Sequence, residues 1–496
     1  MRKLLSLLVV LVLGLSVVAS GCIGGTSGSS GGTGTSSGSS GGGSTATKGI
    51  TLVIVTRHDA TIQYLAQELF LKSKIAKEYH ITNLKFIKVP EALWPEYIKQ
   101  GADVGWGGGP TLFDDMYKMG YLAPITNKSV LDLLGKQIPK TLAGMPMIRE
   151  DNGKVYWIAA ALSSFGFTVN KVQLKKWNLP FPHKWEDIAT PQWARDPPQY
   201  GIADPTRSTS NTRIYQIILQ AFGWDKGWRI MTLIAANSKV YEASDAVRDA
   251  VINGEIAAGN TIDFYGYTAM KQNPNCVYVI PQGESIVNGD PIASLKYSKH
   301  PKAAQAFIYW VLTEGQALWM SPEVNRLPIN PTVFNMTITK EYAQALFNGK
   351  YAGEKYAQAR PTLLKAYKFT LSSKGIPFND AEALATVNSL QYYFKATLVD
   401  VNGPLHQAWM AIVNAYKSGK ITEQQFKELE NELTAPIQFK DPDTEKMVTF
   451  TEDYAKKIND KIATNAAFQS QLMQEWRNAA QAKYNKVLQD LKKMEG

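Results

Sequence analysis

Residues Asp103–Ile125 read DVGWGGGPTLFDDMYKMGYLAPI and carry the clearest strand–turn–helix pattern of the chain. The first four of these residues predict a short strand, and the glycines Gly105–Gly109 mark a tight turn where that strand ends. A helix is expected next, because apolar residues recur there at helical spacing: Leu112, Met116 and Met119. We expect Thr111 to cap this helix and Gly120 to end it.

The same alternation of strand and helix continues on both sides of this stretch. Further strands are expected at 50–55, 84–89, 257–261, 277–280 and 291–295. Further helices are expected at 60–71, 211–222, 226–236, 245–253 and 301–313. Alternation with short turns predicts an α/β protein with parallel sheets and flanking helices.

The last third of the chain has a different pattern. Three capping-box signals precede helical runs: Asn379 with Glu382, Thr422 with Gln425, and Thr449 with Glu452. Strand-like alternation is scarce there, so we expect residues 336–496 to form a mostly α-helical C-terminal extension packed on the α/β body.

The N-terminus carries signals for export. Arg2 and Lys3 precede an apolar run, Leu4–Val18, that is too short to span a bilayer but suits a secretory signal. Small residues then lead to Cys22, an order that resembles a prokaryotic lipobox. Residues 1–21 are therefore expected to be a lipoprotein signal peptide, and Cys22 to carry the lipid. An uncleaved anchor or an ordinary signal peptide is the alternative.

Residues 22–47 join the proposed lipid to the body. Of the 25 residues from 23 to 47, ten are Gly, eight Ser and five Thr, and none is charged or aromatic. Such a chain cannot bury a core and behaves as a coil with an end-to-end distance of roughly 25–30 Å. We expect a stalk that holds the folded body at the outer face of the cell membrane.

Length, charge and cysteine content further limit the classes of protein to which the chain can belong. The 496 residues suggest two to three domains, since single cores stop growing near ~250–300 residues. The net charge is +10, but no Lys/Arg run is dense enough to indicate nucleic acid. With Cys22 lipidated, Cys276 has no partner and is expected to be a buried structural thiol.

Four polar motifs fall where the chain pattern places strand ends or helix starts. They are Ala102–Pro110, Ala203–Thr212, Gly259–Tyr267 and Glu284–Ile292. In the first, Trp106 offers a flat face for stacking and the glycines let backbone N–H groups approach a ligand. In the second, hydroxyls open a helix whose positive dipole end favours an anion, and Arg207 or Arg213 adds charge.

Together with the N-terminal signals, these motifs resemble the extracellular solute-binding proteins of ABC importers, in the group that includes ferric-iron, thiamine and phosphonate binders. The resemblance covers roughly residues 50–335. It implies a two-lobe type II periplasmic-binding-protein fold, with residues 48–150 and 290–335 as lobe one and 151–289 as lobe two. Residues 155–169 and 277–295 are the expected crossovers, and the ligand would lie in the cleft.

The resemblance also implies a set of ligand-binding residues. In lobe one these would be Arg57, His58 and Asp59, with Trp106, Gly107 and Gly108. In lobe two they would be Ser208, Thr209, Ser210, Asn211, Asp263 and Tyr265, with Asp290 near the crossover. The partners implied are importer permease subunits and a small molecule; we expect a monomer, no cofactor and no nucleic acid.

The hydroxyl-rich helix start favours a ligand with an oxyanion, such as a phosphonate, phosphate ester or carboxylate. An iron role is disfavoured, because Tyr265 and Tyr267 are not adjacent as the paired tyrosines of the ferric binders are. His58 is expected to cap a helix rather than bind metal. A secreted hydrolase with an unpatterned carboxylate site and a sensory or structural surface lipoprotein remain as alternatives, although no metalloprotease, P-loop or redox motif occurs.

Overall fold

The computed structural model describes residues 49–495; residues 1–48, which include Cys22 and the proposed signal and stalk, lie outside the described part. Its centre is a sheet whose main path runs β10-β9-β11-β8-β13-β3-β1-β2. These strands are β1 (Ile50–Thr56), β2 (Ile81–Lys88), β3 (Val104–Trp106), β8 (Lys154–Asn170), β9 (Tyr200–Ala203), β10 (Ser238–Tyr241), β11 (Ala258–Ile262) and β13 (Val287–Leu295). Short strands beside this path are β4 (Leu122–Ala123), β7 (Ile148–Asp151), β12 (Cys276–Val279) and β14 (Leu327–Pro328).

Strand β8 joins the two halves of this sheet. Up to Ser164 it pairs antiparallel with β13, and from Phe165 onward it pairs with β11 and then β12. We call lobe one the half that contains β1–β4, β7, β13, β14 and the first part of β8. Lobe two contains β9–β12 and the rest of β8. The crossing by β8 agrees with the sequence expectation for residues 155–169.

The second expected crossover, residues 277–295, also passes from lobe two to lobe one. It does so as two strands, as expected, with β12 ending at Val279 and β13 beginning at Val287, four residues earlier than predicted. The break contains Pro281, which cannot donate to a strand ladder, and Gly283, whose φ is +74°. Only β13 continues into lobe one, where it pairs with β3.

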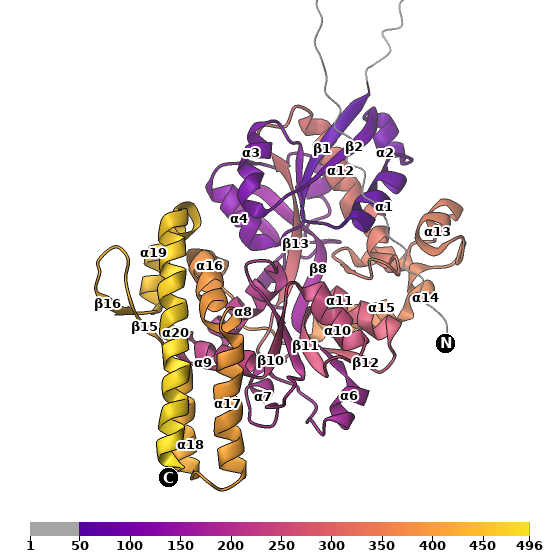
Figure 1. The fold of residues 1–496 in the computed structure, drawn as a ribbon. Coiled ribbons are helices and arrows are strands. Elements are labelled where there is room, and N and C mark those ends of the chain that lie inside the picture. Colours follow the sequence, from indigo (N-terminus) through magenta and orange to yellow (C-terminus); the bar gives the residue numbers. More distant parts are fainter. Residues whose placement is uncertain (1–48, 496) are drawn as a thin grey trace, which may run out of the picture. The chain divides into compact units, whose positions relative to one another are not determined.

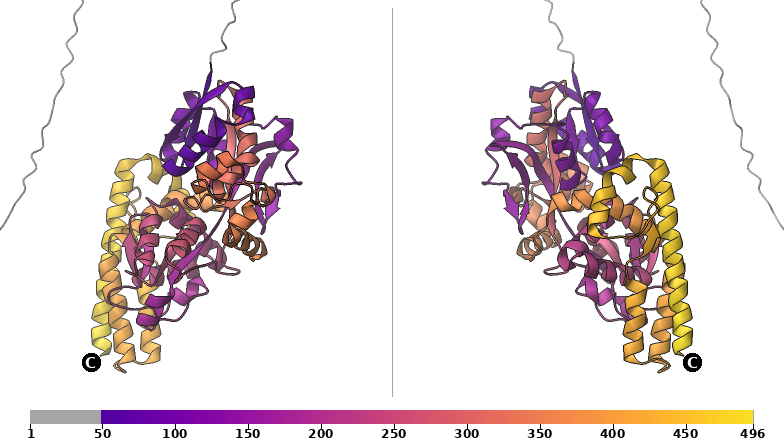
Figure 2. Two further views of the ribbon diagram at one scale, coloured as in Figure 1. Left: turned by 90° about the vertical axis from the view of Figure 1, so that its right-hand side faces the viewer. Right: turned by 90° about the vertical axis from the view of Figure 1, so that its left-hand side faces the viewer.

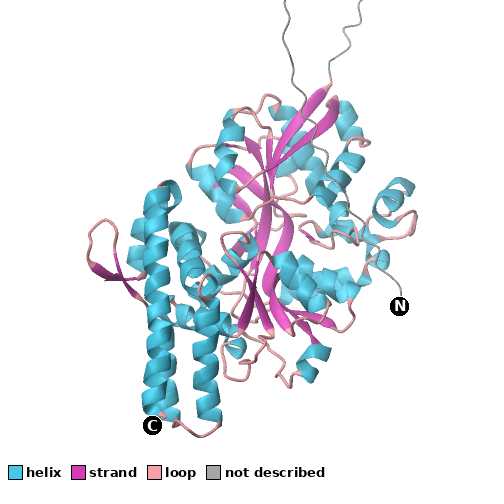
Figure 3. Ribbon diagram, viewed as in Figure 1, coloured by secondary structure: helices cyan, strands magenta, loops and turns pink. Residues whose placement is uncertain are grey.

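Helices cover both faces of the sheet in each lobe (Figure 3). In lobe one they are α1 (Ala60–Phe70), α2 (Lys74–Glu78), α3 (Trp94–Lys99), α4 (Pro110–Lys118), α5 (Lys128–Leu131) and α12 (Pro301–Leu312). In lobe two they are α6 (Lys171–Lys176), α7 (Trp185–Ile188), α8 (Thr209–Phe222), α9 (Trp224–Ala236), α10 (Ser244–Ile252) and α11 (Asp263–Gln272). With β1–β3 and β9–β10 paired in parallel, this is the α/β fold expected from the sequence.

Thr111 and Thr449 were wrongly expected to cap helices. Thr111 does not cap α4; Gly109 is the N-cap and Pro110 is the first helical residue, a position that suits the fixed φ of proline. Likewise Thr451, not Thr449, caps the helix that begins at Glu452. By contrast, the capping box at Thr422 and Gln425 is present.

Residues 336–495, which we call the C-terminal region, are mostly helical, as expected. Its helices are α13 (Lys340–Phe347), α14 (Tyr356–Ala359), α15 (Pro361–Ser372), α16 (Asp380–Phe394), α17 (Asn402–Lys417), α18 (Glu423–Thr434), α19 (Glu452–Thr464) and α20 (Ala466–Met494). A small hairpin, β15 (Gln438–Lys440) and β16 (Met447–Thr449), lies between α18 and α19. Figures 1 and 2 show the long α20 beside α16 and α17 along one flank of lobe two.

One apolar core runs through both lobes and the C-terminal region. Leu52 of lobe one, Ile217 of lobe two and Trp409 all belong to the same cluster of buried side chains, so the C-terminal region is packed on the body rather than separate from it. Cys276 is buried, as predicted, and burial raises the pKa of its thiol to about 11. Among residues 49–495, no helix is both long and apolar enough to cross a bilayer.

Candidate functional site

A cavity of about 360 Å³ lies between the two lobes. The starts of five helices line it, and each follows the carboxyl end of a sheet strand: α1, α4, α8, α10 and α11. The N-terminal end of a helix carries partial positive charge and backbone N–H groups without helical partners. The wall is therefore rich in hydrogen-bond donors before any side chain is considered.

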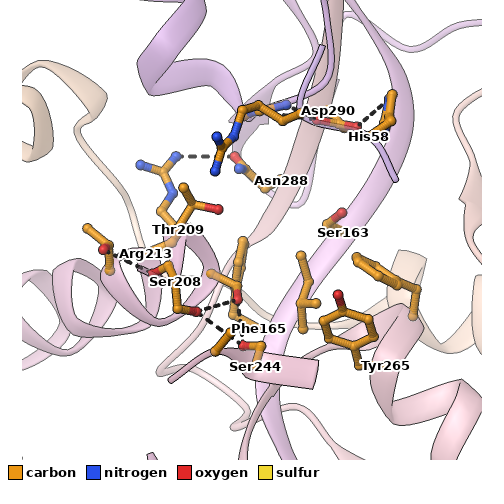
Figure 4. A pocket seen from close by; sticks show the side chains of 18 of the residues that line it. His58, Ser163, Phe165, Ser208, Thr209, Arg213, Ser244, Tyr265, Asn288 and Asp290 are labelled. Carbon is orange, nitrogen blue, oxygen red and sulfur yellow. Dashed lines mark hydrogen bonds and ion pairs between the residues drawn. The ribbon is translucent and has the colours of Figure 1, made fainter. Parts of the chain in front are cut away.

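The lobe-two wall contains three serine hydroxyls in mutual contact (Figure 4). Ser210 Oγ lies 2.7 Å from Ser244 Oγ, and Ser208 Oγ lies 3.2 Å from Ser210 Oγ. Ser208 also caps α8, so the next two residues, Thr209 and Ser210, begin the helix with backbone N–H groups that have no helical partner. Two helix starts, those of α8 and α10, thus present hydroxyls and N–H groups to one point.

The lobe-one wall is built on the glycine turn after β3. Gly107, Gly108 and Gly109 have φ values of +80°, +122° and +89°, which side chains rarely adopt. A Cβ atom at Gly107 would also lie 2.6 Å from His58 Nε2. This turn aims the N–H groups of Gly108 and Gly109 at Asp290 Oδ1, at 3.0 and 3.3 Å.

Asp290 is the centre of a buried charged network. Arg326 Nη1 lies 2.7 Å from Asp290 Oδ2, and both side chains are 7% exposed. Arg326 also donates from Nη2 to Ser163 Oγ on β8, at 2.9 Å. Burial works to raise the pKa of Asp290, but Arg326 and the two glycine N–H groups outweigh it and hold that pKa below its usual value. Asp290 is therefore a permanent carboxylate in the cavity wall.

His58 lies on the other side of Asp290, with Nε2 3.5 Å from Oδ2. Burial lowers the pKa of His58 to about 4, so the imidazole is neutral at pH 7. It does not cap α1 as expected; that role belongs to Asp59, which accepts from Ile62 N at 3.0 Å. Among residues 49–495, no group of three or more His, Cys, Asp or Glu side chains could hold a metal ion.

Six cationic side chains line the cavity, and they divide into two groups. Four have a carboxylate partner: Arg207 with Glu242, Arg213 with Asp380, Arg248 with Asp249, and Arg326 with Asp290. Arg57 and Lys88 have no ion-pair partner within residues 49–495. Both of these belong to lobe one and face the serine cluster of lobe two across the same cavity.

Acidic and apolar side chains complete the wall. Asp59, Glu91, Asp245 and Glu323 line it as well, and burial raises the pKa of Glu91. Phe165, Phe264 and Tyr265 add aromatic surface, with Tyr265 under the guanidinium of Arg248 at 4.7 Å. The cavity thus combines an anion-favouring end with hydrogen-bond acceptors.

Nine of the thirteen residues expected from the sequence line this cavity. They are Arg57, His58, Asp59, Gly108, Ser208, Thr209, Ser210, Tyr265 and Asp290. Trp106, Gly107, Asn211 and Asp263 do not line it. The expectation that Trp106 offers a stacking face is wrong, because the ring is fully buried and packs edge-on to His58 with centroids 4.7 Å apart.

The other three lie directly behind the wall. Asn211 Nδ2 donates to Ser244 Oγ at 2.8 Å and to Ser208 Oγ at 3.2 Å, so it orients the serine cluster. Asp263 Oδ2 accepts from Ser164 N at 2.9 Å, at the point where β8 passes between the lobes. Gly107 shapes the turn beneath His58.

Several lining residues had no usable signal in the sequence. Ser244 stands at the start of an expected helix, outside the four motifs; Asn288 lies in the fourth motif, but the sequence did not single it out from its neighbours. Arg326, Val387 and Gln391 come from segments far along the chain, and only the tertiary fold brings them to the cavity.

A cavity between two α/β lobes that share a crossing strand defines a two-lobed ligand-binding protein. The model of the bacterial extracellular solute-binding protein family matches residues 98–348, just over half of the chain. The chain belongs to that family. The match ends before α16, so most of the C-terminal region lies beyond it.

The phosphoglycerate transport regulatory protein PgtC of Salmonella typhimurium is 30% identical over 177 residues. This match spans 35% of the present chain and 43% of PgtC, less than half of the relative's length. Among solved structures, the periplasmic binding protein AfuA of Actinobacillus pleuropneumoniae, titled with bound fructose-6-phosphate, is 18% identical, with 65% of this chain and 98% of AfuA covered and a TM-score of 0.47. Iron-bound HitA of Pseudomonas aeruginosa has the same identity and TM-score, with 65% of this chain and 99% of HitA covered. Similarity at this level says nothing about the ligand of the present chain.

Proposed function

We propose that this protein binds a small oxyanion-bearing solute in the cavity between its lobes and delivers it to an ABC importer. The observation that carries the proposal is the convergence of five helix starts on one cavity, with the serine cluster where α8 and α10 meet. Helix starts and hydroxyls bind phosphate and carboxylate groups without further machinery.

The two lobes offer different contacts to such an anion. Lobe two supplies the N–H groups of Thr209 and Ser210 and the cluster of serine hydroxyls. Lobe one supplies Arg57 and Lys88, neither of which forms an ion pair within residues 49–495, although Glu91 lies near enough to Arg57 for their charges to interact. An anion held by both lobes favours their closure, because each lobe alone leaves it half-solvated.

The ligand we propose is a phosphate ester that also carries hydroxyl or carboxylate groups. The acidic side chains of the wall, Asp59 and Asp245 among them, can accept hydrogen bonds from ligand hydroxyls. A cavity of about 360 Å³ has room for more than inorganic phosphate. The name of the relative PgtC makes 3-phosphoglycerate the natural first probe.

In this proposal the chain works as one monomer. Lobe one moves against lobe two, as the pairing of β8 divides them, and β8 and β13 carry the hinge. The closed form is what the importer permease subunits receive. No cofactor and no reaction is part of this function, so incubation with the ligand leaves the ligand unchanged.

The serine cluster gives the first test. In the double variant Ser208→Ala/Ser210→Ala, the affinity for 3-phosphoglycerate should fall at least tenfold in a calorimetric titration, because even one lost charge-assisted bond costs about 1.5–3 kcal/mol. Ser73→Ala is the matched control: Ser73 caps α2, far from the cavity, and accepts from Ala76 N at 3.1 Å. Equal affinity in the double variant and the wild type would mean that the serine cluster does not contact the ligand.

Membrane attachment is a separate proposal, because Cys22 lies outside the described residues. If Cys22 carries a lipid, Cys22→Ser should move the protein from the membrane fraction to the soluble fraction of the host. Cys276→Ser, which changes the other cysteine, should stay with the membrane. A Cys22→Ser protein that still sediments with membranes contradicts the lipobox assignment.

A further inference from the structure

The C-terminal region contacts both lobes: α13 lies against α1 of lobe one, whereas α16 is fixed to lobe two. Helix α16 lies against α8, where Gln216 Nε2 donates to Ala383 O at 3.0 Å and Gln220 Nε2 donates to Asn379 O at 2.9 Å. At the other end of α16, Phe394 stacks on Tyr215 with ring centroids 4.0 Å apart. These contacts are spread over the whole length of the helix, so α16 moves with lobe two.

The start of α16 also meets lobe one. Asp380, its first residue, binds Arg213 of α8, with Oδ1 2.5 Å from Nη2. The same Arg213 donates from Nη1 to Thr111 Oγ1 of α4, at 2.9 Å, and Thr111 Oγ1 lies 3.5 Å from Asp380 Oδ1. Figure 1 shows one end of α16 next to α4.

Arg213 has two further contacts in this arrangement. Its Nη2 also donates to Asn288 Oδ1 of β13, at 3.2 Å, and its guanidinium lies 4.2 Å from the ring centre of Phe378. The side chains of Arg213 and Asp380 are 7% and 11% exposed. A pair so well desolvated is costly to break by removing one partner.

Helix α16 also forms part of the cavity itself. Val387 and Gln391 line the cavity, and Gln391 Nε2 donates to Thr212 Oγ1 at 3.1 Å. The cavity therefore has three walls, from lobe one, lobe two and the C-terminal region.

We infer that helix α16 is a clasp on the ligand-binding cleft: it travels with lobe two, forms a third wall, and holds lobe one through the contact of Asp380 and Arg213 with Thr111. This inference rests on the proposed function for the identity of the cavity as the ligand site. The clasp favours the closed arrangement of the lobes and slows escape of the solute.

Hydrogen–deuterium exchange of the full chain, without added ligand, tests the clasp. In Asp380→Ala and in Thr111→Val, the amides of α4 should exchange about tenfold faster than in the wild type, because lobe one has lost its contact with α16. Those of α12, also in lobe one, should be unchanged. Glu423→Ala is the matched control, since Glu423 is the exposed first residue of α18 and pairs only with Lys427.

The two variants separate a clasp from a folding defect. Faster exchange throughout the chain in Asp380→Ala would indicate a folding defect. In that case Thr111→Val tests the clasp, because it leaves the pair of Asp380 and Arg213 intact. Unchanged exchange of α4 in Thr111→Val overturns the inference.

A titration with 3-phosphoglycerate gives the second readout. The clasp predicts about tenfold weaker binding in Asp380→Ala. Tighter binding would mean that Asp380 competes with the anion for Arg213, and it would overturn the clasp. If the wild type binds no phosphate ester, the proposed function fails, while the exchange measurement still decides whether α16 holds lobe one.

Discussion

Replacement of Asp290 by alanine is expected to lower the free energy of unfolding by about 3–5 kcal/mol, the usual cost of removing one partner from a buried charged network. Asp290 neutralises Arg326 at 2.7 Å and receives the N–H groups of Gly108 and Gly109. Without it, Arg326 stays buried and unpaired, and the glycine turn loses its acceptor. Urea unfolding followed by tryptophan fluorescence measures the change.

A matched control separates this network from ordinary ion pairs. Asp249 pairs with Arg248 at 2.8 Å, but its side chain is 54% exposed. Asp249→Ala should therefore change the unfolding free energy by less than about 1 kcal/mol. If Asp290→Ala costs no more than Asp249→Ala, the network does not hold the lobe-one wall in place.

The second large effect concerns pH. Burial raises the pKa of Asp263 to about 7 and lowers that of His58 to about 4. Between about pH 4 and 6.5, folding takes up a proton at Asp263 and releases one at His58. The Asp263 contribution makes stability fall as pH rises through this window, and the His58 contribution makes it rise, so the two offset each other in the wild type.

Single variants should show separately the two opposite pH dependences of the unfolding free energy. Relative to the wild type, the unfolding free energy of Asp263→Asn should increase with pH by roughly 2–4 kcal/mol between pH 4 and 7, and that of His58→Gln should decrease by roughly 2–4 kcal/mol between pH 4 and 6.5. Urea unfolding at several pH values measures both. Curves that run parallel to that of the wild type would mean that neither group titrates as its buried position requires.

Much of the fold could be predicted because local patterns determine it. The strand at residues 103–106, its glycine turn and the helix after it are encoded within twenty residues, and so is the α8 start at Ser208. Helix ends were less certain, as at Thr111, because a proline at the first helical position outweighed a capping hydroxyl.

The site could be predicted only in part, for a physical reason. Residues at neighbouring strand ends of one lobe, such as His58 after β1 and Gly108 after β3, are brought together by any parallel sheet. Whether such a residue faces the cavity or the core depends on packing across the chain. Trp106 turned inward because His58 and Trp319 cover it, and nothing near Trp106 in the sequence indicates that.

The ion-pair partners of the site residues could not be predicted from sequence patterns. Arg326 reaches Asp290 from 36 residues further along the chain, and Asp380 reaches Arg213 from 167 residues further along. Asp380 stands in the capping-box signal of Asn379 and Glu382, but that signal predicts a helix start and not a contact with Arg213. The contacts of the C-terminal region with the cavity were therefore visible only in the structure.

Calorimetric titration of the wild-type chain measures whether the cavity binds a phosphate-bearing solute. We expect 3-phosphoglycerate or a related phosphate ester to bind with 1:1 stoichiometry, and glycerate, which lacks the phosphate, to bind at least tenfold more weakly. The recovered ligand should be unchanged. Equal binding of both compounds, no binding of any phosphate ester, or conversion of the ligand into a product would contradict the account.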